Sequence, residues 1–167
     1  DTQSCRATWL MQYGDCGYNS KDGARSWQAD KRPGQSIPTA HWRQEDPGVI
    51  PSGCIYGNGS PTGVTYYEGG CLGQRYASGL LLSCEAGQNV VWGFLRKPLG
   101  AGFALEAFPF IRSTDVQDPN YVWHKSEEDR RKWFRPSDVT VGADGAIYVA
   151  DWFDAVVGGH QMKDNAG

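Results

Sequence analysis

Two histidines stand where an imidazole could act as a general base. His41 lies in the run IPTAHWRQEDPG, beside a tryptophan and just before the carboxylates Glu45 and Asp46. His160 lies in VVGGHQM, where the flanking glycines would let a ligand come close to the backbone. The pKa of histidine is near neutral pH, so either side chain could take a proton from a hydroxyl group. A lone histidine is also common as a structural or surface residue, and that alternative stays open.

A second group of residues, which could bind a cofactor or a metal ion, lies between positions 135 and 154. The Arg135 guanidinium presents a planar fork of donors that suits a carboxylate of a cofactor or substrate. Asp138, Asp151 and Asp154 could supply hard oxygen ligands to Ca²⁺, although no EF-hand spacing is present. The alternatives are an arginine stacked on a neighbouring ring or paired with Asp138, and aspartates that accept backbone N–H bonds at turns.

Most tryptophans lie in the irregular parts of the chain, and five cysteines are spread along it. The tryptophans of the loops could form a platform for a sugar ring, or could pack between elements; they are Trp27, Trp42, Trp123, Trp133 and Trp152. The five cysteines form no CxxC or CxxCH pattern, which disfavours a zinc ribbon and a c-type haem in this segment. Their odd number leaves at least one thiol unpaired within the chain, and one or two disulfides are plausible in an exported protein.

The composition indicates an all-β fold. Twenty-two glycines and nine prolines disfavour long helices, whereas the aromatic content of 13% suits half-buried strands. A formal net charge of −3 leaves no basic footprint for nucleic acid. Apolar runs such as GLLLSC are strand-sized, so no transmembrane segment is expected in this chain.

The pattern of apolar residues divides the chain into regions. We expect a loop-rich region over 1–60, one blade over 61–113, a connecting loop over 114–134 and an incomplete next blade over 135–167. The blade is a meander of four antiparallel strands, predicted over 63–69, 79–85, 89–96 and 104–112. Four such strands form the unit of a β-propeller, and the missing strands of the second blade predict a fragment of a longer protein.

The stretch RPSDVTVGADGAIYVADW predicts a β-hairpin. Val139 and Val141 share one face of its first strand, and Ile147 and Val149 share one face of its second. Gly145 would supply the positive φ that the turn needs.

These motifs, taken in order, resemble the glucose/sorbosone dehydrogenase family of six-bladed β-propellers. The runs RPGQSIPTAHWRQEDPGV, PTGVTYYEG and YVADWFDAVVGGHQM are similar to the propeller of membrane-bound dehydrogenases from planctomycete-type bacteria, which are large exported proteins. The resemblance covers nearly the whole chain. It implies a periplasmic or extracellular oxidoreductase that oxidises a sugar or alcohol.

The resemblance also implies cofactors and roles for single residues. Relatives bind pyrroloquinoline quinone (PQQ) at one end of the propeller, often with Ca²⁺, and use a histidine of an earlier blade as the base. Here Arg135, Thr62 and Asp138 would hold the quinone, Asp151 and Asp154 would bind the metal, and His41 or His160 would line the substrate mouth. The corresponding strand of soluble relatives often carries two arginines, of which only Arg135 matches here. The alternative is a non-catalytic propeller that binds glycans or a protein partner.

Overall fold

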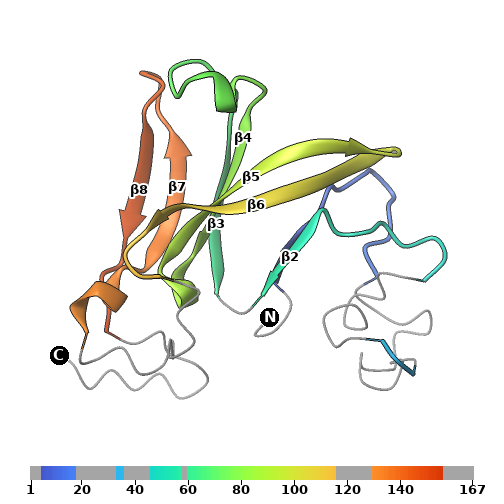
Figure 1. Ribbon diagram of the computed structural model, residues 1–167, viewed down its shortest axis with the longest axis horizontal. Helices are drawn as coiled ribbons and strands as arrows, with labels where there is room; N and C mark the ends of the chain where they lie inside the picture. Colours follow the sequence, from blue (N-terminus) through green and yellow to red (C-terminus); the bar gives the residue numbers. More distant parts are fainter. Residues whose placement is uncertain (1–4, 18–32, 36–45, 58–59, 116–128, 156–167) are drawn as a thin grey trace. The chain divides into compact units, whose positions relative to one another are not determined.

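The computed structural model describes residues 5–17, 33–35, 46–57, 60–115 and 129–155 (Figure 1). They form antiparallel β-sheets, and no α-helix occurs among them, so the predicted all-β class is confirmed. No closed barrel or propeller is detected in the described part of the chain. None of the described residues belongs to a helix long and apolar enough to cross a membrane.

The chain separates into two compact units. The first unit comprises residues 1–58 with 96–106, and the second comprises residues 59–95 with 107–167. This division differs from the predicted blade over 61–113, because the third and fourth strands are longer than expected. Their outer halves belong to the first unit.

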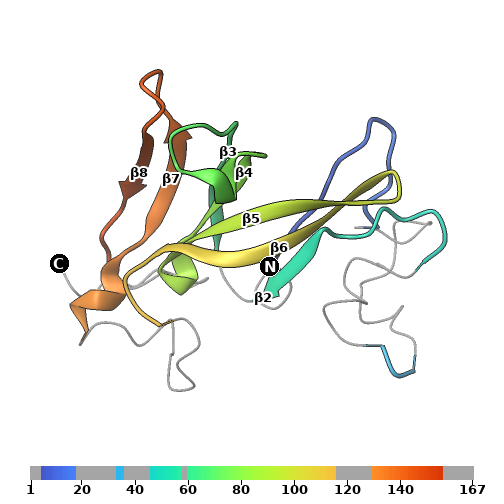
Figure 2. The ribbon, with the colours of Figure 1, turned by 45° about the horizontal axis from the view of Figure 1, so that its top comes forward.

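The second unit contains the predicted meander, apart from the parts of its third and fourth strands within residues 96–106. Its strands pair in the order β3-β4-β5-β6, and their bounds are Pro61–Tyr67, Leu80–Glu85, Val90–Leu99 and Gly102–Arg112. A further hairpin follows, formed by β7 (Pro136–Val141) and β8 (Ile147–Asp151). Its turn contains Gly145 at φ 78°, as the sequence predicts. Figures 1 and 2 both show β7 beside β3 and β4.

The apolar core of this unit joins the four-stranded sheet to the hairpin. Leu80, Leu82 and Cys84 on β4 are fully buried and pack in one cluster with Val139 of β7. Val141, Ile147 and Val149 pack against the same cluster, whereas Tyr148 is 54% exposed. The predicted faces of the hairpin are therefore confirmed. Burial of these side chains stabilises the unit because it removes apolar surface from water.

Gly63 allows β3 and β7 to approach closely. A Cβ added at this position would meet the Asp138 side chain, and would lie 2.6 Å from the Asp138 Cα and 2.9 Å from the Val139 nitrogen. Because two of these atoms are backbone, a rotamer change cannot relieve the clash.

We therefore expect Gly63→Ala to lower the free energy of unfolding by about 2 kcal/mol, the usual scale of overpacking. Urea denaturation followed by tryptophan fluorescence measures it. Gly102→Ala is the matched control, since its added Cβ would meet no atom nearer than 3.7 Å. Equal stabilities of the two variants would contradict the close approach.

The first unit contains two short strands, β1 (Cys5–Ala7) and β2 (Cys54–Gly57), which pair antiparallel. The Gly53 N–H donates to the Ala7 carbonyl at 2.9 Å, and the Leu105 N–H donates to the Gly53 carbonyl at 2.9 Å. No disulfide bond joins the cysteines of the described residues, so the expected disulfides do not occur there.

Three short 3₁₀ turns complete the described elements: η1 (Gln74–Tyr76), η2 (Ala86–Gln88) and η3 (Arg130–Trp133).

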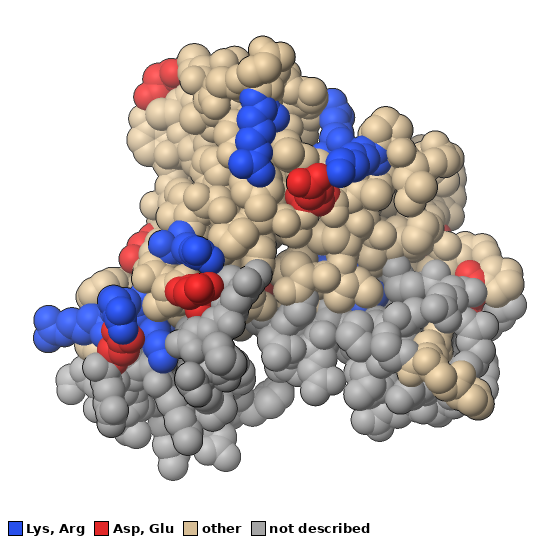
Figure 3. Space-filling view, in the orientation of Figure 1, with Lys and Arg blue, Asp and Glu red and all other residues tan. Residues whose placement is uncertain are grey.

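On the face shown in Figure 3, the described charged side chains lie in small groups of both signs rather than in one patch. In the first unit, Lys97 and Glu106 form an exposed ion pair with an N–O distance of 2.6 Å.

Candidate functional site

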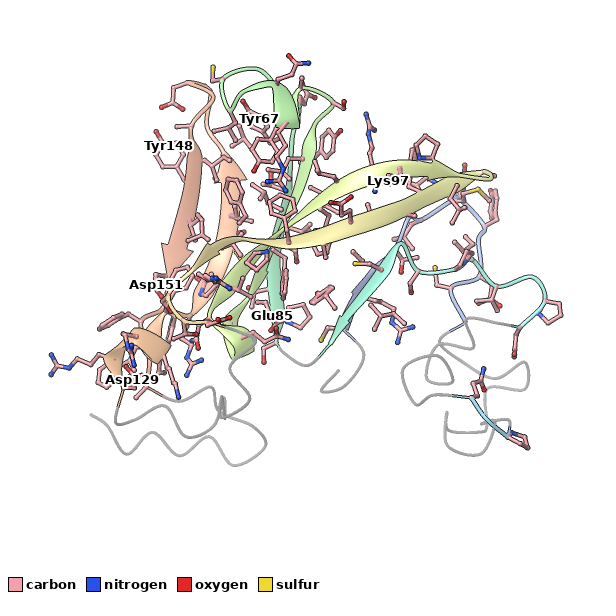
Figure 4. The ribbon with its side chains drawn as sticks, viewed as in Figure 1. Tyr67, Glu85, Lys97, Asp129, Tyr148 and Asp151 are labelled. Carbon is pink, nitrogen blue, oxygen red and sulfur yellow. The ribbon has the colours of Figure 1, made fainter. Side chains whose placement is uncertain are left out.

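Polar side chains gather at one end of the strands of the second unit. β3 begins and β4 ends there, at the paired residues Pro61 and Glu85. β7 begins and β8 ends there as well, at the paired residues Pro136 and Asp151. The Thr62 hydroxyl links the two sheets, since it donates to the Pro136 carbonyl at 2.8 Å. In Figure 4, Glu85 and Asp151 lie at this end, and Tyr67 and Tyr148 lie at the other.

We call Thr62, Glu85, Asn89, Arg135 and Asp151 the strand-end cluster. Three of them are candidates from the sequence, and the structure brings these three to one end of the unit. Glu85 and Asn89 were not predicted.

Arg135 is almost as deeply buried as Glu85, since only 2% of its surface is exposed. Its Nε donates to the Asp154 carbonyl at 3.0 Å, and its two terminal nitrogens donate to the carbonyls of Ala86 (3.0 Å) and Ala155 (3.1 Å). One guanidinium thus ties the turn after β4 to the segment after β8. These bonds fit a structural role better than the carboxylate clamp, although the partners are backbone carbonyls rather than the neighbouring ring or Asp138.

Asp151 caps the turn that follows β8. Its Oδ1 accepts from the Arg135 N–H at 2.8 Å and from the Phe153 N–H at 2.9 Å. The Asp154 N–H donates to the Trp133 carbonyl at 3.0 Å. Both aspartates therefore lie at a turn rather than at a cluster of ligands. Among the described residues no group of three metal-ligating side chains occurs, so the Ca²⁺ role stays a prediction.

Glu85 is a carboxyl group with no exposed surface. Its Oε1 accepts from the backbone N–H groups of Ser60 and Gly87. Its Oε2 is buried and has no hydrogen-bond partner in the described part of the chain. Burial raises the pKa of Glu85 to about 7, and the two backbone donors only partly oppose this effect. Glu85 can therefore change its charge near neutral pH.

Asn89 closes the turn between β4 and β5. It adopts the left-handed conformation, with φ 56° and ψ 42°, which asparagine tolerates better than most residues. Its buried side-chain amide donates to the carbonyls of Lys132 (2.6 Å) and Phe134 (2.7 Å). Asn89 and Arg135 together hold the turn after β4 against the chain that leads into β7.

Asp138 is the third residue of β7 and is exposed. Its Oδ1 accepts from the Val139 N–H at 2.9 Å. The buried thiol of Cys84 lies near Asp138 and Thr62. Burial first, and then the charge of Asp138, raise the pKa of Cys84 to about 11, despite a hydrogen bond to Thr62. This thiol therefore stays protonated at neutral pH and is a poor nucleophile.

Two large aromatic side chains project from the turn after β8. Trp152 is 73% exposed and Phe153 is 58% exposed. Phe153 has φ 47°, a conformation that costs a bulky residue of the order of 1–3 kcal/mol. Its ring lies 5.5 Å from the Trp133 ring at an angle of 59°, and the Trp152 N–H donates to the Arg135 carbonyl at 2.9 Å. The backbone of this turn is firmly held, while its aromatic surface faces solvent.

His41 and His160 lie outside the described residues, and their predicted roles stay predictions. So do the roles of Trp27, Trp42 and Trp123.

Comparison with known proteins gives a family but no activity. No curated protein and no solved structure matches the chain. The family model described as "Domain of unknown function (DUF7133)" matches residues 31–166. The match includes the whole strand-end cluster and both histidines, and it covers well over half of the chain. The chain therefore belongs to the DUF7133 family.

Proposed function

We propose that this chain is a segment of a β-propeller domain that binds a sugar or a related alcohol. We further propose that the whole protein is an exported oxidoreductase of the glucose/sorbosone dehydrogenase kind. The order of the strands supports the first part. A four-stranded meander is followed by a hairpin whose first strand, β7, lies beside the first strand of the meander, β3. Successive blades of a propeller are related in this way.

The observation that carries sugar binding is the exposed aromatic pair Trp152 and Phe153 on a held turn. A sugar ring has an apolar C–H face that can lie on an aromatic side chain, and hydroxyl groups at its edge. Asp151 is exposed beside the pair, and none of the bonds described for it uses its Oδ2. The turn thus carries two exposed aromatic side chains and a carboxylate oxygen on consecutive residues, groups that suit such a ligand.

The described residues do not fit the direct binding of PQQ. The guanidinium of Arg135 is buried and bonded to three backbone carbonyls, and the Thr62 hydroxyl is bonded to a fourth. Asp138 would repel an anionic quinone. If the whole protein uses PQQ, residues elsewhere must bind it, and the strand-end cluster would only support the site.

The oxidoreductase proposal rests on the resemblance of the ordered motifs and on the gathering of Thr62, Arg135 and Asp151 at one strand end. Its test is reduction of a redox dye by the full-length protein with PQQ and Ca²⁺, over a panel of aldoses, ketoses and sugar alcohols. Sugar-dependent reduction is expected. Sugar binding without any reduction would favour the non-catalytic propeller, for which the engagement of Arg135 by backbone carbonyls is the favouring observation.

We expect Trp152→Ala to weaken the binding of the best sugar by about tenfold, because stacking on one aromatic ring contributes roughly 1–1.5 kcal/mol. Its stability should stay within about 0.5 kcal/mol of the wild type, since the side chain is exposed. Isothermal titration calorimetry measures the binding.

Tyr148→Phe is the matched control, as an exposed aromatic residue at the other end of the hairpin. Unchanged binding in Trp152→Ala would contradict the proposed sugar surface.

A further inference from the structure

The first unit contains a hollow that lies outside the strand-end cluster and the proposed sugar surface. It has a volume of about 430 Å³ and lies between the segment after β1, the loop at 48–51 and the turn between β5 and β6. Pockets that bind small molecules commonly have volumes of roughly 300–1,000 Å³. We call it the Trp9 hollow; the side chains that shape it are Trp9, Met11, Val49, Ile50, Leu99 and Phe103.

The walls of the Trp9 hollow are apolar. No charged side chain is among its described lining residues, and glycines 48, 100 and 102 add bare backbone. Trp9 and Phe103 meet edge to face, with ring centroids 5.2 Å apart and planes at 78°. These two rings form a corner of nearly perpendicular walls. A flat ring placed in the corner could stack on one wall and meet the other with its edge.

The backbone around the hollow is fixed by hydrogen bonds. The Ile50 N–H donates to the Asp15 carbonyl at 2.7 Å, and the Gly14 N–H donates to the Met11 carbonyl at 3.0 Å. In the same unit, Gly53 packs closely against β6, because an added Cβ would come within 2.7 Å of the Leu105 side chain. The Arg96 guanidinium lies 5.7 Å from the Phe103 ring centroid and helps to fix that ring. These contacts fix the backbone and one aromatic ring around the hollow.

Leaving this surface in water is unfavourable. Trp9 and Met11 are each 48% exposed, and Leu99 is 61% exposed. Contiguous exposed apolar surface of this kind usually marks a place where something binds. The concave shape favours a compact ligand, and the absence of charged side chains from the described lining favours an uncharged one.

We propose that the Trp9 hollow binds a small, uncharged molecule that contains an aromatic ring. The site lies in the first unit, and its residues take no part in the proposed sugar surface. The two proposals can therefore fail independently.

The test is titration of the full-length protein with the uncharged fluorescent probe N-phenyl-1-naphthylamine. The expected result is a saturable rise in probe fluorescence with one site per chain. Ala101→Phe places a large side chain at the hollow, and Trp9→Ala removes one wall. We expect each to raise the Kd of the probe at least tenfold.

Leu10→Ala is the matched control, because Leu10 is 71% exposed and is not among the lining residues. Its Kd should be within twofold of the wild type. Failure to saturate, or equal Kd values for Ala101→Phe and the wild type, would overturn the proposal. Sedimentation of the chain as a dimer that the probe dissociates would also overturn it, since a second copy would then be the occupant.

Discussion

Arg135→Met is expected to lower the free energy of unfolding by about 4 kcal/mol. The substitution removes the donors of three backbone carbonyls: that of Ala155, which is buried, and those of Ala86 and Asp154, which are part-buried. Each orphaned buried acceptor costs about 1–3 kcal/mol, and apolar packing of methionine recovers only part of this. Urea denaturation followed by tryptophan fluorescence measures the loss. Arg135→Lys should recover little, because one ammonium group cannot span three separated carbonyls.

The control is Arg131→Met. Arg131 lies four residues earlier and makes a 2.8 Å ion pair with Asp129, but its side chain is 79% exposed. Exposed ion pairs contribute roughly 0–1 kcal/mol, so this variant should be almost as stable as the wild type. If Arg135→Met lowered the free energy of unfolding as little as Arg131→Met, the hydrogen bonds of the guanidinium would not stabilise the fold. A role in binding a ligand would then be the better interpretation.

Parts of the second unit can be predicted from the alternation of apolar and polar residues and from the residues of the turns. Val139, Val141, Ile147 and Val149 repeat with the period of two that a half-buried strand requires, and the structure buries that face. Such local patterns predict the existence of strands better than their ends. β5, for instance, continues to Leu99, beyond the predicted end at residue 96.

The partners of the strand-end cluster could not be predicted in the same way. Arg135 binds the carbonyl of Ala86, which is 49 residues away in the chain, and every residue type carries a carbonyl. The sequence therefore contains no signal that identifies this acceptor. Glu85 was missed for a related reason, because a glutamate at the end of a strand is usually solvated. The only local sign was the glycine at position 87, whose N–H the carboxylate accepts.

Glu85 is expected to make the protein less stable as the pH rises towards 7. Its pKa is about 7 in the folded chain, against an ordinary value of 4.5. Between these two pH values the folded chain keeps the proton, while the unfolded chain releases it. The unfolded state then binds fewer protons, so the free energy of unfolding falls with rising pH, by about 3 kcal/mol in total over this interval. At pH 8 the carboxylate is charged and buried, with its Oε2 unpartnered among the described residues.

Glu85→Gln should remove this loss, because an amide stays neutral and its oxygen can still accept from Ser60 and Gly87. The measurement is the difference in free energy of unfolding between Glu85→Gln and the wild type at pH 4.5, 6 and 8. Contributions from the other titrating groups cancel in this difference. We expect the difference to rise by about 3 kcal/mol in favour of the variant from the lowest pH to the highest.

Glu68→Gln provides the comparison, because Glu68 is an exposed carboxyl of the same unit and its replacement should change stability by less than about 0.5 kcal/mol. A flat difference for Glu85→Gln would mean that the carboxyl ionises in the folded chain much as it does in water. Solvent or a cation would then have to reach Oε2. A rising difference would instead identify Glu85 as a neutral acid at pH 6, buried at the same end of the strands as Asp151.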